Sequence, residues 1–303
     1  MTVPRAAASF LEVRKALIAG AALLASAASA CSGGSVSKQS LTVGVAASPP
    51  PLAGALVLGA ESGSRAVALA VLRGRLTATV LSPEGGPLSG LAVSFRVGSR
   101  VIEAAACGDG CYSAAAPRAT RIEVRQSGSR PVVFHIPANA PPAAAIVARA
   151  ARVTRRLRSL VYVESLRSGP TGGLLTTWRL QAPSQVEYRI RGGASAVVLG
   201  TRRWDRDRPG AKWRRSQQLP ALRVPQPAWG SRATNARLLG ETHVAGRPVW
   251  IVSFVNPSTP AWFTAWIDRA TYRPLRLHMT AAAHFMTHRY LEFNQPVTIR
   301  PPK

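Results

Sequence analysis

The amino-acid sequence predicts a mainly β protein, in which a small antiparallel β-sandwich is followed by an antiparallel half-barrel that one amphipathic helix covers. Three observations support this prediction. Short segments of alternating apolar and polar residues recur between residues 66 and 136, separated by Gly, Pro and Ser turns. A single helical pattern follows at residues 141–160. Beyond it, almost every segment again alternates with the period of two that is typical of a strand.

The composition is that of a folded chain. Of 303 residues, 47% are hydrophobic and 17% are charged, which is too apolar for a disordered tail. The 39 basic residues outnumber the 13 acidic ones, and the formal net charge is +26. Only four of the basic residues are lysines, and this arginine excess indicates a G·C-rich coding bias rather than a dedicated nucleic-acid patch. We therefore expect no nucleic-acid partner, and the composition leaves the oligomeric state open.

Residues 1–30 have the pattern of an export signal. Arg5, Arg14 and Lys15 precede an uncharged apolar run at residues 16–30, which is too short to span a bilayer as a helix. No other apolar run approaches the length of about 18 residues that a spanning helix needs. The sequence therefore predicts an exported protein.

The export signal ends in the small residues Ala28-Ser29-Ala30, directly before Cys31. This junction resembles a bacterial lipobox. The resemblance implies that Cys31 becomes the mature N-terminus and carries diacylglycerol and an N-acyl chain such as palmitate. These chains would anchor the protein to the outer face of the cell membrane. Ala28 stands where leucine is commoner, so cleavage without lipidation is the alternative.

Three segments follow the signal. Residues 31–52 are rich in Ser, Gly and Pro and are expected to form a flexible tether. A Pro-rich stretch then separates a sandwich domain at 53–137 from a half-barrel domain at 138–303. The sandwich part holds nine arginines against five acidic residues. The half-barrel part holds 26 basic against seven acidic residues and all seven tryptophans, so most of the positive charge belongs to it.

Short, regularly spaced strands predict the antiparallel sandwich. They are expected at residues 66–72, 76–81, 92–97, 101–106, 122–124 and 132–136. The order of segments, including ATVLSP at 78–83 and GLAVSF at 90–95, weakly resembles the small Ig-like domains of the FixH/YtkA type found in bacterial envelope proteins.

Cys107 and Cys111 flank the loop Gly108-Asp109-Gly110 between two expected strands. The two glycines can supply the positive φ of a tight hairpin, and the short loop brings both Cβ atoms within disulfide range. We expect a structural disulfide in the oxidising compartment that export implies. Copper binding by this pair is the alternative, but no His or Met stands nearby.

The half-barrel part begins with a basic amphipathic helix. Its apolar residues recur at spacings of four and three, at Ile146, Ala150, Val153, Leu157 and Leu160. Arginines cover the rest of the helix, namely Arg149, Arg152, Arg155, Arg156 and Arg158. Strands are expected afterwards at residues 160–166, 174–181, 185–191, 196–199, 202–205, 212–215, 236–241, 249–255, 262–268, 274–280 and 285–293.

One helix followed by a long antiparallel meander is the element order of the LolA, LppX and LprG group of exported carriers. The resemblance covers most of residues 141–303 and is carried by RPVWIVSF at 247–254, WIDRATYRPL at 266–275 and YLEFNQPVTI at 290–299. It implies a cavity between the sheet and the helix that holds a lipid or an acyl group.

The sequence gives little support for an enzymatic function. No nucleophile elbow, zinc-protease motif, P-loop or dinucleotide-binding motif occurs. Asp205 and Asp207 could form an acid pair, but the interleaved arginines Arg206 and Arg208 and the turn Pro209-Gly210 predict a solvated hairpin tip. We therefore expect no catalysis and no resident cofactor.

An open sheet whose concave face is incompletely covered by one helix leaves room for an apolar ligand. The expected partners are a lipid or other amphiphile in this cavity, and an anionic membrane or envelope surface that the charge attracts. The candidate residues lining the cavity are Trp178, Trp213, Trp250, Phe254, Trp262 and Trp266. The alternative for each of them is an ordinary place in the hydrophobic core.

Three of the five histidines and both internal methionines fall in one predicted hairpin. On a strand, His284, Met286 and His288 point to one face, and a three-residue loop places His278 on the same face. A shift of the hairpin by one residue would replace His278 with Met279. Imidazole and thioether favour copper, particularly Cu(I). A copper-binding envelope protein is therefore an alternative function, and a ligand-free interaction or sensing module is a third.

Overall fold

The computed structural model describes residues 49–230, 232–258 and 260–303. The export signal predicted at 1–30, the lipidation site Cys31 and most of the predicted tether lie outside the described residues. Within the described part, no helix is long and apolar enough to cross a membrane.

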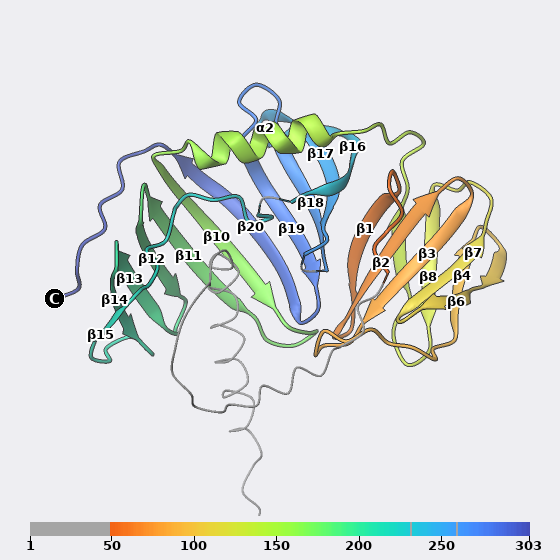
Figure 1. Ribbon diagram of the computed structural model, residues 1–303, viewed down its shortest axis with the longest axis horizontal. Coiled ribbons are helices and arrows are strands. Elements are labelled where there is room, and N and C mark those ends of the chain that lie inside the picture. Colours follow the sequence, from red (N-terminus) through yellow and green to blue (C-terminus); the bar gives the residue numbers. More distant parts are fainter. Residues whose placement is uncertain (1–48, 231, 259) are drawn as a thin grey trace, which may run out of the picture.

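The first folded part is a sandwich of two antiparallel sheets (Figure 1). The strand order is β1-β2-β3-β7-β6 in one sheet and β5-β4-β8-β9 in the other, and their inner faces enclose a core around Leu69, Phe95 and Ile122. The strands are β1 (Leu56–Ser62), β2 (Arg65–Leu72), β3 (Arg75–Leu81), β4 (Val93–Val97), β5 (Arg100–Glu103), β6 (Ala105–Gly108), β7 (Cys111–Ala115), β8 (Arg121–Gln126) and β9 (Val132–His135).

The predicted sandwich is confirmed, with two additions. Strand β1 was not expected from the sequence. Strand β7 follows the predicted Cys107–Cys111 hairpin, where no strand bounds had been assigned, and the expected strand at 101–106 divides into β5 and β6. Strand β1 begins with three consecutive buried residues because it packs on the sandwich core on one side and on the half-barrel on the other. A strand buried on both faces lacks the alternation by which strands are recognised in a sequence.

The second folded part is one antiparallel sheet of eleven strands, in the order β15-β14-β13-β12-β11-β10-β20-β19-β18-β17-β16. Its edge strands do not pair with each other, so the predicted half-barrel is confirmed as an open sheet. Every strand predicted after the helix is present. The bounds are β10 (Ser159–Arg167), β11 (Leu174–Gln181), β12 (Gln185–Ile190), β13 (Ser195–Leu199), β14 (Arg202–Arg206), β15 (Arg214–Gln217), β16 (Thr234–Val244), β17 (Arg247–Asn256), β18 (Ala261–Asp268), β19 (Pro274–Ala281) and β20 (His284–Phe293).

The sheet is not the simple meander that the sequence predicted. Its first strand β10 pairs with its last strand β20, and this pairing joins two separate meanders in the middle of the sheet. The pairing of Glu164 with His288 and of Tyr162 with Tyr290 therefore brings together residues that lie far apart in the sequence.

Helix α2 (Ala144–Arg155) lies across the concave face of this sheet (Figure 1). Its buried residues are Val147, Ala150, Ala151 and Thr154. The buried face of the helix is rotated by about one residue from the apolar face that the sequence predicted, since Ile146 and Val153 are only half-buried. Thr154 can be buried because its hydroxyl donates a hydrogen bond to the Ala150 carbonyl at 2.9 Å. The five arginines predicted on the outer face are all exposed.

The connection between β15 and β16 also crosses the concave face (Figure 1). Its Trp229 is 1% exposed and packs edge-on against Phe254, with ring centroids 5.5 Å apart. Phe254 in turn stacks on Phe263 at 5.3 Å. These rings fill the end of the concave face that β17 and β18 form.

The sandwich packs against the convex side of the half-barrel. The outer faces of β1 and β2 supply Val57 and Ala68, which form one buried cluster with Trp262 and Phe285 of the half-barrel. The domain boundary predicted at 137–138 falls between strand β9 and helix α2. The division into two domains stays a prediction.

Candidate functional site

The half-barrel holds a cavity of about 230 Å³ on its concave face. Strands β10 to β14, the hairpin β19–β20 and the connection before β16 all contribute to its wall. The wall is mainly apolar and includes Leu160, Leu180, Val186, Val198 and Leu222. The cavity lies at the end of the concave face that Trp229 and its neighbours leave unfilled.

A row of aromatic rings from four adjacent strands lines one side of this cavity. Trp178 lies directly opposite Tyr188 on one neighbouring strand and Tyr162 on the other, and Tyr162 lies opposite Tyr290. The ring centroids are 5.0 Å apart for Trp178 and Tyr188, 5.9 Å for Trp178 and Tyr162, and 5.5 Å for Tyr162 and Tyr290. Directly opposed side chains on one sheet face pack in this way, so the row is a consequence of register.

A buried polar cluster interrupts the apolar wall. The Nε2 atom of His288 lies 2.8 Å from a carboxylate oxygen of Glu164, and its Nδ1 atom lies 3.3 Å from the Tyr290 hydroxyl. The ring of Tyr162 packs on His288 with centroids 4.7 Å apart. Burial, and secondarily the charge of Glu164, raises the pKa of the Tyr162 and Tyr290 hydroxyls well above the usual range. Both phenols are therefore neutral hydrogen-bonding groups.

One donor in the wall has no partner. The indole Nε1 of Trp178 is buried and makes no hydrogen bond within the described part of the chain. A buried donor without an acceptor costs about 1–3 kcal/mol. Because Trp178 lines the cavity, an acceptor group on a bound molecule would remove this cost.

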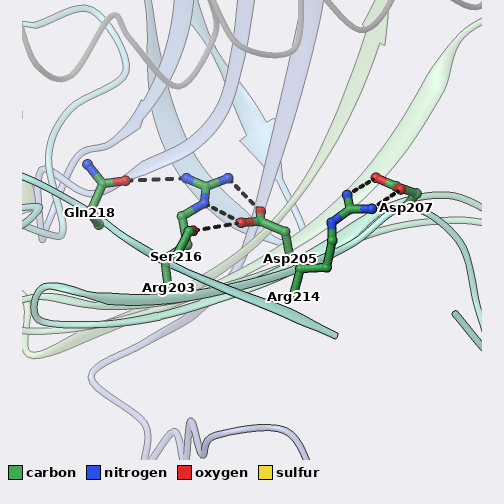
Figure 2. Close-up of polar contacts among 6 residues, drawn as sticks. All are labelled: Arg203, Asp205, Asp207, Arg214, Ser216 and Gln218. Atoms are coloured by element: carbon green, nitrogen blue, oxygen red, sulfur yellow. Dashed lines mark hydrogen bonds and ion pairs between the residues drawn. The ribbon is translucent and has the colours of Figure 1, made fainter. Parts of the chain in front are cut away.

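One arginine–carboxylate pair borders another part of the cavity wall, to which Arg203 and Gln218 contribute. Figure 2 shows Arg203 donating to both oxygens of Asp205, at 2.7 and 2.8 Å, and to Gln218 at 3.3 Å. These hydrogen bonds to Asp205 raise the pKa of Arg203. Arg203 is therefore positively charged, and the carboxylate of Asp205 balances its charge.

Asp207 accepts two hydrogen bonds at 2.8 Å from Arg214 on the neighbouring strand (Figure 2). Asp205 and Asp207 are therefore each held by an arginine, Arg203 and Arg214 respectively. Glu164 differs, because it faces His288 rather than an arginine.

The structure separates the six aromatic residues that the sequence proposed for the cavity, and only Trp178 lines it. Phe254 and Trp250 also lie on the concave side but in the filled part, where Phe254 is fully buried and Trp250 packs on Tyr272 at 5.1 Å. Sequence reasoning missed the tyrosines of the aromatic row. The meeting of Tyr290 with Tyr162 could not be predicted, because it depends on the pairing of β10 with β20.

Trp262, Trp266 and Trp213 lie away from the concave face. On β18, Phe263 and Ala265 belong to the concave core, so strand alternation directs Trp262 and Trp266 to the convex side. There, Arg276 lies over the Trp266 ring at 4.8 Å. Trp213 packs on a small cluster that contains Val297 and Ile299 of the C-terminal tail; Arg206 lies over its ring at 4.7 Å.

Trp262 lines a second cavity, of about 630 Å³, at the junction with the sandwich. Small apolar residues and threonines of β1, β2 and β3 form its other wall, together with Pro49–Leu52, where the described part of the chain begins. It is larger than the cavity in the half-barrel, but it has no counterpart of the Glu164–His288 cluster. The polar cluster makes the half-barrel cavity the better candidate site.

The histidine and methionine hairpin adopts the register shifted by one residue. A two-residue turn, Ala282–Ala283, pairs Ala281 with His284 and Met279 with Met286, so that the expected three-residue loop is wrong. Met279, His284, Met286 and His288 line the cavity, and His278 does not. A slip of one residue moves a side chain to the other face of a strand. Burial, with Arg276 and Arg167, lowers the pKa of His278 at its place outside the cavity.

No group of three or more His, Cys, Asp and Glu residues that could hold a metal occurs within the described ranges. Cys107 and Cys111 form the predicted disulfide at the tip of the β6–β7 hairpin, with Cα atoms 5.0 Å apart. Gly108 and Gly110 have positive φ, as expected.

No known protein family and no curated protein matches the sequence. Among solved structures, the lipoprotein LppX of Mycobacterium tuberculosis is similar at 15% identity over 52% of this chain and 97% of that chain, with a TM-score of 0.41. LprF of Mycobacterium bovis is similar at 16% identity over 54% and 99%, with a TM-score of 0.41. A LolA superfamily protein of Nitrosomonas europaea is similar at 11% identity over 54% and 96%, with a TM-score of 0.25.

Proposed function

We propose that this protein is an envelope lipoprotein that binds a lipid or another small amphiphile in the cavity of its half-barrel. One observation carries the proposal: an apolar cavity contains a convergent polar cluster and the unpartnered indole donor of Trp178. Apolar walls with a few placed polar groups are typical of small-molecule sites. The ligand would place its acceptor group at Trp178 and its apolar part along Leu160, Leu180 and Val186.

The size of the cavity limits the ligand. Its volume of about 230 Å³ is below the range of about 300–1,000 Å³ that is usual for ligand pockets. A single acyl chain or a molecule of similar bulk is therefore the class that fits, and a lipid with several long chains would leave part of itself outside.

The proposed place of action is the outer face of a cell membrane. The signal pattern before Cys31 supports lipid anchoring, and the exposed arginines of α2 support attraction to anionic membrane or envelope surfaces. Because carboxylates such as Asp205, Asp207 and Glu187 are paired with arginines, we propose ligand binding without catalysis.

Adjacent threonines on β11 provide a matched test. Thr176 is buried in the cavity wall and Thr177 is exposed on the next position of the strand. The full-length protein would be titrated with a fluorescent polyene fatty acid. We expect Thr176→Phe to weaken binding by about tenfold or more, because overfilling a packed space costs about 1–3 kcal/mol. Thr177→Phe should bind as the wild type does.

A second variant tests the polar end of the cavity. Trp178→Phe keeps an aromatic ring but removes the unpartnered donor, and we expect weaker fatty-acid binding with unchanged folding. Native mass spectrometry of the protein extracted from its membranes would show both a bound amphiphile and the acyl mass on Cys31. Probe binding that is unchanged in both Thr176→Phe and Trp178→Phe would contradict binding in this cavity. A protein that is isolated empty and does not bind the probe would instead favour a ligand-free interaction module.

A further inference from the structure

Beyond amphiphile binding, the geometry points to a Cu(I) site formed by Met279, Met286 and His284 at the end of the β19–β20 hairpin. All three side chains line the same cavity. This set replaces the one expected from the sequence, because the observed register exchanges His278 for Met279 and because His288 is already engaged by Glu164 and Tyr290.

Strand pairing brings the three ligands together. Met279 and Met286 are directly opposite each other, and His284 is the next residue of β20 on the same face. Cβ atoms of directly opposed residues are about 4.5–5.5 Å apart, and diagonal neighbours lie within reach of long side chains. Two flexible thioethers and one imidazole can therefore converge on a single ion.

The hydrogen bond of His284 prepares its ring for coordination. Its Nδ1 atom lies 3.0 Å from the carbonyl oxygen of Ala282. A carbonyl oxygen only accepts hydrogen bonds, so Nδ1 carries the proton and Nε2 presents its lone pair. Metal-binding histidines usually donate their second ring nitrogen to a carboxylate or a backbone carbonyl in this manner.

The donor set selects the metal. Thioether sulfur is a soft donor that suits Cu(I), and imidazole also binds copper, whereas hard divalent ions prefer oxygen. The three ligands are neutral, and the carboxylate of Glu164 lies in the same cavity wall. No electron transfer is invoked, because the ion binds in the reduced state in which it is supplied.

The test is a competition for Cu(I) between the full-length protein and a chromophoric Cu(I) chelator, under anaerobic conditions with ascorbate. The double variant Met279→Leu with Met286→Leu keeps the bulk and apolarity of the wall. We expect its affinity for Cu(I) to fall by about 100-fold or more, since loss of even an outer-shell partner costs about 10–100-fold. His284→Ala should show a comparable loss.

His278→Ala is the matched control, because His278 belongs to the same hairpin but does not line the cavity. It should bind Cu(I) as the wild type does. Unchanged affinity in the double leucine variant, or a loss confined to His278→Ala, would overturn the proposal. Methionine methyl NMR with Ag(I) gives a second measurement, in which the signals of both Met279 and Met286 must shift.

The variant Thr176→Phe separates this proposal from the proposed function, because Thr176 lines the cavity but is not one of the three Cu(I) ligands. In the same Cu(I) competition, Thr176→Phe should keep the affinity of the wild type for Cu(I), even though its fatty-acid binding is weakened. Loss of Cu(I) affinity in a folded Thr176→Phe variant would contradict a metal site formed by Met279, Met286 and His284 alone.

Discussion

At the scale of single residues, buried charges show how this chain uses its few carboxylates. Asp268 is 1% exposed at the end of β18. Its Oδ1 atom accepts hydrogen bonds from the backbone nitrogen and the hydroxyl of Thr271 at 2.7 and 2.6 Å, and its Oδ2 lies 2.8 Å from Nε of Arg247. One carboxylate thus connects the β18–β19 turn with the neighbouring strand β17.

Removing this charge should destabilise the fold. Asp268→Asn loses the ion pair with Arg247 and weakens the turn, and we expect a loss of about 1–3 kcal/mol in the free energy of unfolding near neutral pH. The measurement is urea unfolding followed by tryptophan fluorescence. Asp207→Asn, in an exposed pair with Arg214, is the control and should cost no more than about 1 kcal/mol.

The stabilisation by Asp268 should also depend on pH. Burial raises the pKa of Asp268, but the hydrogen bonds from Thr271 and the charge of Arg247 outweigh burial and hold the pKa below its ordinary value of 3.8. A carboxylate with a lowered pKa stabilises the folded state above its ordinary pKa and loses this effect as pH falls through the folded value. The difference between wild type and Asp268→Asn should therefore shrink below pH 3.8. A difference that stays constant into strong acid would contradict this assignment.

At the scale of elements, the β19–β20 hairpin shows how a turn determines which side chains enter the cavity. The turn residue Ala283 has a φ of +55°. An L-residue in the left-handed region costs about 1–2 kcal/mol. Alanine gives no turn signal in the sequence, so neither the length of this turn nor the register of the hairpin was predicted correctly.

Substitution at the turn tests this account. Ala283→Gly should stabilise the protein by up to about 1 kcal/mol, because glycine adopts positive φ without a steric penalty. Ala282→Gly is the control. Ala282 has ordinary φ, so added freedom in the unfolded chain should destabilise the protein by about 0.5–1 kcal/mol. Thermal unfolding measures both effects. The unfolding midpoint should rise in Ala283→Gly and fall in Ala282→Gly. Equal shifts of the midpoint in both variants would disprove the role of backbone strain.

Helix α2 is the other element whose placement matters for the site. Its exposed arginines and its buried small residues agree with the amphipathic pattern in the sequence. Covering the sheet required a second segment, the connection before β16, whose Leu222, Val224 and Pro227 line the cavity. These residues lie in an irregular segment without periodicity, so sequence reasoning could not assign them to the site.

At the scale of the whole molecule, the sandwich and the half-barrel meet through a close backbone contact. A Cβ atom added to Gly59 of β1 would lie 2.6 Å from the Cβ of Trp262 and 2.9 Å from the Cβ of Thr280. Glycine is needed here because the strand approaches the half-barrel more closely than a side chain permits. The ion pair of Glu61 with Arg167 spans the same junction.

Gly59→Ala should therefore loosen the junction. Relieving the clash requires the two parts to move apart, and we expect a cost of about 1–3 kcal/mol. A lower thermal unfolding midpoint and faster proteolysis between β9 and α2 would report it. Gly169→Ala is the control, since the nearest atom to its added Cβ is 3.7 Å away and it should behave as the wild type does. Equal midpoints for both variants would show that the junction tolerates the extra atom.

The sequence by itself determined the mainly β class, the strands of the half-barrel, the covering helix and the Cys107–Cys111 disulfide. These features depend on local patterns, namely alternation, helical periodicity and loop length, which any segment carries within itself. The tertiary structure alone decided that β10 pairs with β20 and that the hairpin turn has two residues. It thereby decided that Tyr162, Glu164 and His288 meet in a cavity. It also decided which face of β18 is concave, so that Trp262 and Trp266 lie outside the cavity. Residues on distant strands become neighbours through register, and a shift of one residue exchanges one face of a strand for the other.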